Sequence, residues 1–99
     1  MPSLRIDNLG QTAIIECAGR FVRNDAASKL RCAVTSQTNA RVVVLDLTDM
    51  HAIGGGGLGT LLLLQQWAHD HNIQFKLLNP SGSVLDKLKH VDFEIVQIA

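Results

Sequence analysis

Residues 42–64 read VVVLDLTDMHAIGGGGLGTLLLL, and this stretch decides the fold class. The β-branched and almost wholly apolar run over 42–47 predicts a central strand that is covered on both faces. The four glycines at 54–57 predict a short loop, and the leucine-rich segment after them predicts a helix over about 57–71. In parallel α/β sheets, ligands and partners bind where such loops leave the carboxyl ends of the strands. We therefore expect the glycine run to lie at the functional end of the fold.

The segments on either side of this stretch complete an order of strands and helices. We expect strands over 4–9, 13–18, 74–78 and 93–98, a helix over about 24–36 and a short helix that begins at Ser81 or Ser83. The first two strands are joined by so short a turn that they must form an antiparallel hairpin. The resulting order, β-β-α-β-α-β-α-β, predicts an α/β fold with a small, mixed, mostly parallel β-sheet flanked by helices.

Composition and charge exclude several classes of protein. With 99 residues, of which 46% are hydrophobic, the chain is expected to form a single domain over 1–99. Nine Lys and Arg balance nine Asp and Glu, so no basic surface for nucleic acid is expected. The longest apolar runs, such as 61–64, are too short to cross a bilayer, and no secretory signal is visible. We therefore expect a cytoplasmic protein without membrane insertion.

Metal and catalytic chemistry are not indicated by the sequence. Cys17 and Cys32 have neither CxxC spacing nor a nearby histidine cluster, which predicts two reduced thiols and no metal site. No Ser, Cys or Thr nucleophile lies in the glycine run, and His51 just before it supplies at most the base of a triad. The sequence therefore predicts a protein that is not an enzyme and that holds no cofactor.

A glycine run before a helix also suggests a phosphate-binding loop, because backbone N–H groups at a helix N-terminus attract anions. The Walker pattern requires a lysine, and Gly59 is followed by Thr60 and Leu61. The dinucleotide pattern GxGxxG matches residues 54–59, but a run of glycines matches almost any glycine pattern, and the dinucleotide framework needs a longer chain. A nucleotide- or anion-sensing module remains an alternative function for the loop.

The stretch over 42–64 resembles the most recognisable motif of the STAS domain, the fold of bacterial anti-sigma factor antagonists and of the cytoplasmic tails of sulfate transporters. In that family a hydrophobic strand ends Asp-Leu-Ser, and Asp-Ser-Ser-Gly-Leu-Gly and a leucine-rich helix follow a few residues later. Residues 46–48 (Asp-Leu-Thr) take the first place and residues 57–59 (Gly-Leu-Gly) the second. The turn at 19–21 and the Asn79-Pro80 break also resemble the family, so the resemblance covers nearly the whole chain.

The departure from the family falls on its functional residues. In the family, the second serine of Asp-Ser-Ser-Gly is commonly phosphorylated by a partner kinase, and the preceding aspartate assists. Gly54, Gly55 and Gly56 stand at these positions, so Gly56 marks a degenerate phosphorylation site without a hydroxyl. Thr48 and Thr60 are the nearby hydroxyls considered as substitutes. The resemblance thus implies a permanently unphosphorylated binder, or a relative that is regulated in another way.

The predicted long helix offers a surface for a partner beside the glycine run. The residues expected to pack on the sheet share one broad side of the helix: Leu58, Leu61, Leu62, Leu64 and Ala68. Leu63 and Trp67 lie nearly opposite, four residues apart, with Thr60 on the same side. Aromatic residues such as Trp67 anchor many interfaces, and cover of this face by a neighbouring segment is the equal alternative. The expected partner-binding residues are Gly54, Gly55, Gly56, Gly57, Thr60, Leu63 and Trp67.

The resemblance implies a bacterial, non-enzymatic signalling protein of the anti-sigma factor antagonist type, which acts in transcription regulation through protein–protein interaction. Its implied partner is an anti-sigma factor/serine kinase or a related ATPase. An alternative from another class is an accessory subunit of a membrane transporter ATPase, since single STAS domains also resemble partners of such transporters.

Overall fold

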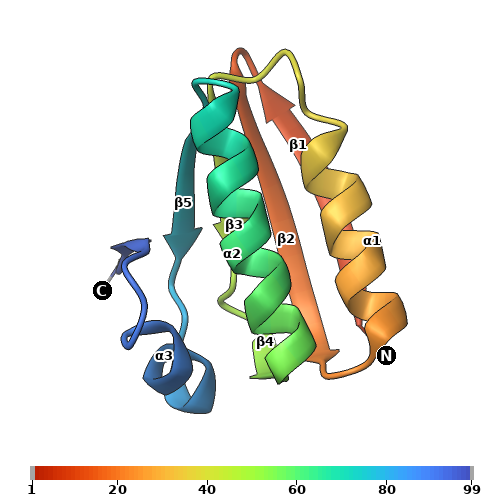
Figure 1. Ribbon diagram of the computed structural model, residues 1–99, viewed down its shortest axis with the longest axis vertical. Helices are drawn as coiled ribbons and strands as arrows, with labels where there is room; N and C mark the ends of the chain where they lie inside the picture. The colour runs from red at the N-terminus through yellow and green to blue at the C-terminus, as the bar shows by residue number, and fades with distance from the viewer. Residues whose placement is uncertain (1, 99) are drawn as a thin grey trace.

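The computed structural model describes residues 2–98 (Figure 1). Its elements in chain order are β1 (Ser3–Leu9), β2 (Thr12–Phe21), α1 (Asn24–Thr35), β3 (Val42–Asp46), β4 (Met50–Ile53), α2 (Gly55–Asp70), β5 (Gln74–Leu78), α3 (Gly82–Leu88) and β6 (Glu94–Val96). Every element expected from the sequence is present, with small differences at the ends. One strand, β4, is additional. Within the described range, no helix is long and apolar enough to cross a membrane.

The strands form one sheet in the order β1-β2-β3-β5-β6, and β4 pairs with β2 outside this path. β1 and β2 form the expected antiparallel hairpin, in which Ile6 lies opposite Ile15. All the other pairs, namely β2–β3, β2–β4, β3–β5 and β5–β6, are parallel. The predicted mixed, mostly parallel sheet is therefore confirmed.

β4 pairs with a part of β2 where the sequence predicts a turn. Residues 19–21 continue β2 instead of leaving the sheet, with a register shift between Gly19 and Arg20. Gly19 has a φ of 97°, a conformation that favours glycine and that lets an irregular strand bend. β2 can therefore pair first with β3 and then with β4, which brings Phe21 opposite Ile53 at the base of the long helix.

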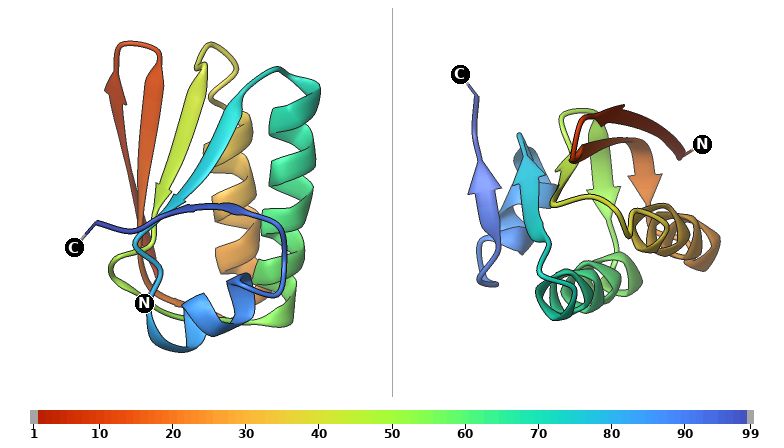
Figure 2. Two further views of the ribbon diagram at one scale, coloured as in Figure 1. Left: turned by 90° about the vertical axis from the view of Figure 1, so that its left-hand side faces the viewer. Right: turned by 90° about the horizontal axis from the view of Figure 1, so that it is seen from above.

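The two long helices cover only one face of the sheet. α1 and α2 lie side by side on this face, and α3 packs against β4 at the end of the sheet (Figure 2). Along β3, Val43 and Leu45 are fully buried, whereas Val42 and Val44 alternate with them and are half-buried on the opposite face. The prediction that this strand is covered on both faces is therefore wrong. Neighbouring side chains of the sheet, such as Ile14 beside Val44, give the open face its partial shielding.

The core lies between the sheet and the two long helices. The helices contribute the buried residues Ala26, Leu30, Val34, Leu61, Leu64 and Ala68. Cys17 of β2 belongs to this core, and its pKa is raised from 9.0 to about 12 by burial and, to a smaller extent, by the nearby Asp46 carboxylate. The Cys17 thiol therefore stays protonated at neutral pH, whereas Cys32 is exposed on α1.

Candidate docking site at the start of the long helix

The glycine run is helical, and the predicted loop is wrong. Gly54 is the N-cap of α2, with φ −92° and ψ 178°, and residues 55–57 form its first turn. The carbonyl of Gly54 accepts the N–H of Leu58 at 2.9 Å, and the N–H of Gly54 donates to the carbonyl of Phe21 at 3.0 Å. None of the four glycines has a positive φ. The connection between β4 and α2 is a single residue, because β4 ends at Ile53 and α2 begins at Gly55.

Only one of these glycines is required by packing. A Cβ on Gly57 would lie 2.8 Å from Ile53 Cγ1 and 3.1 Å from a backbone carbonyl oxygen of β2, closer than packed atoms allow. A Cβ on Gly55 would meet no atom within 4 Å, and one on Gly56 would meet only Asn24 Oδ1 at 3.6 Å. Gly55 and Gly56 are also exposed. The first turn of α2 is therefore accessible to a partner at Gly55 and Gly56, whereas Gly57 lies on its buried side.

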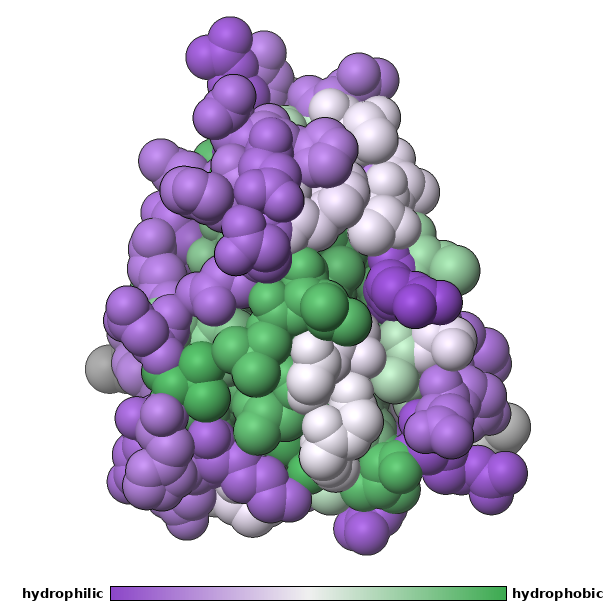
Figure 3. Space-filling view, in the orientation of Figure 1, coloured by the Kyte–Doolittle hydropathy of each residue, from purple (hydrophilic) through white to green (hydrophobic). Residues whose placement is uncertain are grey.

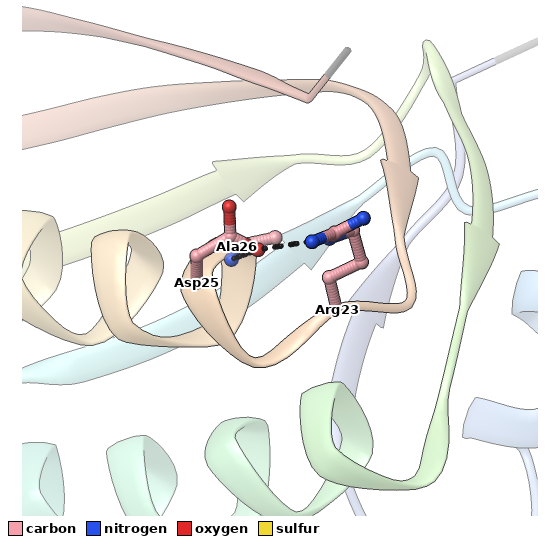
Figure 4. Close-up of polar contacts among 3 residues, drawn as sticks. All are labelled: Arg23, Asp25 and Ala26. Carbon is pink, nitrogen blue, oxygen red and sulfur yellow. Dashed lines mark hydrogen bonds and ion pairs between the residues drawn. The ribbon is translucent and has the colours of Figure 1, made fainter.

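The starts of α1 and α2 lie next to each other, because Val22 and Asn24 are the nearest neighbours of Gly54 and Gly56. Neither helix begins with a side-chain cap. At α1, a carboxylate partly compensates: Asp25 accepts the N–H of Ala26 at 3.0 Å and pairs with Arg23 at 3.6 Å (Figure 4). The first turn of α2 has no acidic residue. Its backbone donors and the positive end of its dipole therefore lack a side-chain acceptor of their own helix.

A lysine that is distant in the sequence lies beside the residue that precedes the glycine run. Lys87 of α3 donates its Nζ proton to the carbonyl of Ile53 at 2.6 Å, one residue before the glycine run. The bond holds α3 against the end of β4 and places a cation beside the base of α2. Sequence reasoning missed this residue, because no local pattern links positions 34 residues apart.

Leu62 of α2 is exposed, although the sequence predicts that it packs on the sheet. The buried line of the helix consists of Gly57, Leu61, Leu64 and Ala68. Leu63 is 64% exposed, as its place opposite the core predicts, but Leu62 is also exposed, at 41%, and does not pack on the sheet. The reason is helical geometry. The buried residues at 57, 61, 64 and 68 are three or four positions apart and lie along one side of the helix, whereas position 62 is rotated by about 100° from the buried position 61. This spacing is the signal that could have identified Leu62.

Trp67 and Thr60 are less accessible than the sequence analysis predicts. Both are half-buried. Trp67 packs against the edge of the core, and its ring stacks on that of His71 with the centroids 4.6 Å apart. His71 Nδ1 also lies 2.7 Å from the carbonyl oxygen of Trp67. The indole is therefore partly covered by the chain itself, and Leu63 is the more accessible anchor of the pair.

We define the α2 ridge as Gly55, Gly56, Leu62 and Leu63, which are all exposed on this helix. No charged side chain occurs from Gly55 to Ala68. Figure 3 shows the result on this face of the molecule, a hydrophobic area over the middle of α2 with hydrophilic side chains around it. Exposed apolar patches with a polar border, and surfaces depleted of charge, are typical of protein interfaces. The ridge is therefore a candidate docking surface.

Of the groups considered for catalysis or modification, Thr60 lies half-buried on α2, whereas His51 and Thr48 lie away from the ridge. His51 is exposed on β4. Thr48 donates its Oγ1 proton to Asp46, which also accepts the N–H of Thr48 at 3.0 Å. Both residues line a cavity of about 300 Å³ with Arg5 and Glu16, where a phosphate on Thr48 would face carboxylates. Within residues 2–98, no group of three His, Cys, Asp or Glu side chains could hold a metal ion.

A family model for the STAS domain matches residues 7–98 of the chain. The chain belongs to the STAS domain family. A search of the curated proteins finds no matching sequence. Among solved structures, the STAS fold seen here is similar to SpoIIAA, an anti-sigma factor antagonist of Bacillus solved in phosphorylated and unphosphorylated forms. With the phosphorylated form the TM-score is 0.82 at 13% identity, over 98% of this chain and 92% of that one.

Two further solved structures share the fold. A putative anti-sigma factor antagonist of Thermotoga maritima has a TM-score of 0.79 at 16% identity, over 97% of this chain and 86% of that one. The murine anion transporter Slc26a9 has a TM-score of 0.68 at 16% identity, over 87% of this chain but only 14% of the transporter. These similarities confirm the predicted anti-sigma factor antagonist-like fold.

Proposed function

We propose that this STAS domain is a non-enzymatic protein-binding regulator of the anti-sigma factor antagonist type, which docks its partner through the start and the outer face of α2. The observation that carries the proposal is the α2 ridge, where Leu62 and Leu63 are exposed on a helix face without charge. Beside them, Gly55 and Gly56 leave the backbone of the first turn accessible. The proposed site comprises Gly54, Gly55, Gly56, Gly57, Thr60, Leu63 and Trp67, and we add Leu62 because its side chain is exposed.

The missing hydroxyl at Gly56 determines how the proposed binding would be regulated. Phosphorylation of a serine adds about −1.5 to −2 charges at neutral pH, and at a helix start this changes what can dock there. SpoIIAA has both a phosphorylated and an unphosphorylated form. This chain carries Gly56 where the family serine would stand, so its first turn keeps one charge state. We therefore propose a binder whose docking surface is not switched by phosphorylation at this position.

The partner that fits this role is an anti-sigma factor/serine kinase or a related ATPase in the bacterial cytoplasm. The alternative partner is a membrane transporter ATPase, of which this chain would be an accessory subunit. It is supported by the similarity to Slc26a9, where the same fold forms a small part of a transporter. The two alternatives differ in the protein that binds, and we propose the same surface of α2 for both.

Leu63→Ala is expected to weaken partner binding by about 30-fold, which corresponds to the 2 kcal/mol typical of an interface anchor. Leu9→Ala on β1 is the matched control, because Leu9 is also a leucine with 64% exposure but lies outside α2. Proteins captured from the native cell by the immobilised chain are identified by mass spectrometry, and the dissociation constant of the captured ATPase is then measured for each variant. Equal affinities of both variants would reject the α2 site.

A further inference from the structure

The α1 side of the α2 ridge is bordered by an arginine. α1 and α2 run side by side in the same direction (Figure 1), and Asn24 is the neighbour of Gly56. Residues seven apart on a helix lie nearly on the same side, two turns further on. Arg31 follows Asn24 by seven residues, as Leu63 follows Gly56. By this spacing, Arg31, which is exposed, lies two turns beyond Asn24 on α1, at about the level that Leu63 has on α2.

The opposite side of the ridge is bordered by Lys87. Its Nζ lies 2.6 Å from the carbonyl oxygen of Ile53, which precedes the first turn of α2. α3 packs against β4, so this cation is held at the base of the ridge by the fold itself. The ridge thus has one cation beside its middle and one beside its start.

Both cations lack a carboxylate partner within the described part of the chain. The ion pairs formed there by other basic residues are Arg5–Asp7, Arg23–Asp25, Lys76–Glu94 and Lys89–Asp86. Arg31 and Lys87 belong to none of them. The first turn of α2 adds the positive end of a helix dipole with no acidic residue to offset it. The charge-free ridge is therefore flanked by two cations, Arg31 and Lys87, that form no ion pair within residues 2–98.

We infer that the α2 ridge fits a partner protein that presents an aliphatic face bordered by carboxylates. This inference rests on the proposed function and specifies the chemistry of the partner. The aliphatic face would cover Leu62 and Leu63, while the carboxylates would pair with Arg31 and Lys87. Charges at the rim of an interface steer the encounter and select the partner, whereas buried apolar contacts hold the complex. A basic partner would be repelled by the same two cations.

The test uses two synthetic amphipathic helical peptides of the same length, with one leucine stripe each. One peptide carries glutamate at all other positions and the other carries lysine. Each is titrated into the ¹⁵N-labelled chain, and the backbone amide signals are followed by NMR. In 20 mM NaCl the Leu/Glu peptide is expected to bind about tenfold more tightly and to shift the signals of residues 58–63. In 0.3 M NaCl the ratio should fall to about twofold, because the screening length drops from about 20 Å to about 6 Å.

Arg31→Glu combined with Lys87→Glu is expected to reverse this preference. Lys87 donates a hydrogen bond to the backbone, so its substitution also removes a contact of the fold. Arg31 is exposed, and Arg31→Glu alone therefore serves as the variant that disturbs the fold least. Arg41→Glu, at an exposed residue before β3, makes the same charge change away from the ridge and should leave the preference intact.

Equal binding of the two peptides, shifts confined to the open face of the sheet, or tighter binding to phosphatidylserine vesicles than to the Leu/Glu peptide would each overturn the inference. These outcomes differ from a failure of the proposed function. If Leu63→Ala weakens capture of the ATPase while peptide charge has no effect, the docking site stands and only the partner chemistry is wrong.

Discussion

Leu61→Ala is expected to lower the free energy of unfolding by about 2–5 kcal/mol, the range observed when a buried leucine is truncated. Leu61 is completely buried between α2 and the sheet, so the removed methyl groups leave a cavity. Leu62→Ala, at the next position of the same helix, is expected to change the same free energy by less than about 0.5 kcal/mol. The difference follows from exposure alone, because the two substitutions are chemically identical.

Urea denaturation of the two variants, followed by circular dichroism, measures both free energies. The pair tests the rotation of α2 about its axis, on which the α2 ridge depends. If Leu62→Ala proved as costly as Leu61→Ala, Leu62 would lie in the core, and the ridge as defined here would not exist. A similar slope of free energy against urea in both variants would show that the unfolding transition itself is unchanged.

Gly57→Ala is expected to lower the free energy of unfolding by about 1–3 kcal/mol, the usual effect of an extra methyl group in a packed site. The new Cβ would have to push aside both Ile53 and the backbone of β2, and backbone cannot move locally as a side chain tip can. Alanine also gains up to about 1 kcal/mol of helix propensity over glycine, which offsets part of this cost and places the net loss towards the lower end of the range.

Gly55→Ala is the control for this prediction, because its Cβ would enter open space. It is expected to raise the free energy of unfolding by about 0.4–1 kcal/mol through the lower flexibility of the unfolded chain. Thermal unfolding in a calorimeter compares the two variants. Stabilisation by both substitutions would mean that Gly57 is not pressed against β2, and that the first turn of α2 lies further from the sheet.

The order of elements could be predicted from the sequence because most of its signals are local. The turn after residue 9 requires a hairpin, and the leucine-rich segment after the glycine run has the length of a helix. The motif at 46–59 led to the STAS family, which the match over 7–98 confirms. In each of these cases neighbouring residues carry the information.

The features that the sequence did not indicate depend on contacts between distant segments. β4 is a strand because it pairs with the end of β2, and the bend at Gly19 makes this pairing geometrically accessible. The open face of β3 was missed because an apolar strand has the same composition whether one or both faces are covered. Lys87 reaches Ile53 only in the folded chain. Leu62 is the exception, since the spacing of the buried line on α2 identifies its exposure.

Hydrogen–deuterium exchange of the chain, alone and in complex with the captured ATPase, tests the central claim most directly. The first-turn N–H groups of α2 have no acceptor within the helix, so exchange there is fast until a partner covers it. We predict that the complex protects the segment from Gly54 to Trp67 and leaves the open face of β3 unchanged. Protection on β3 with no change at the start of α2 would contradict the account.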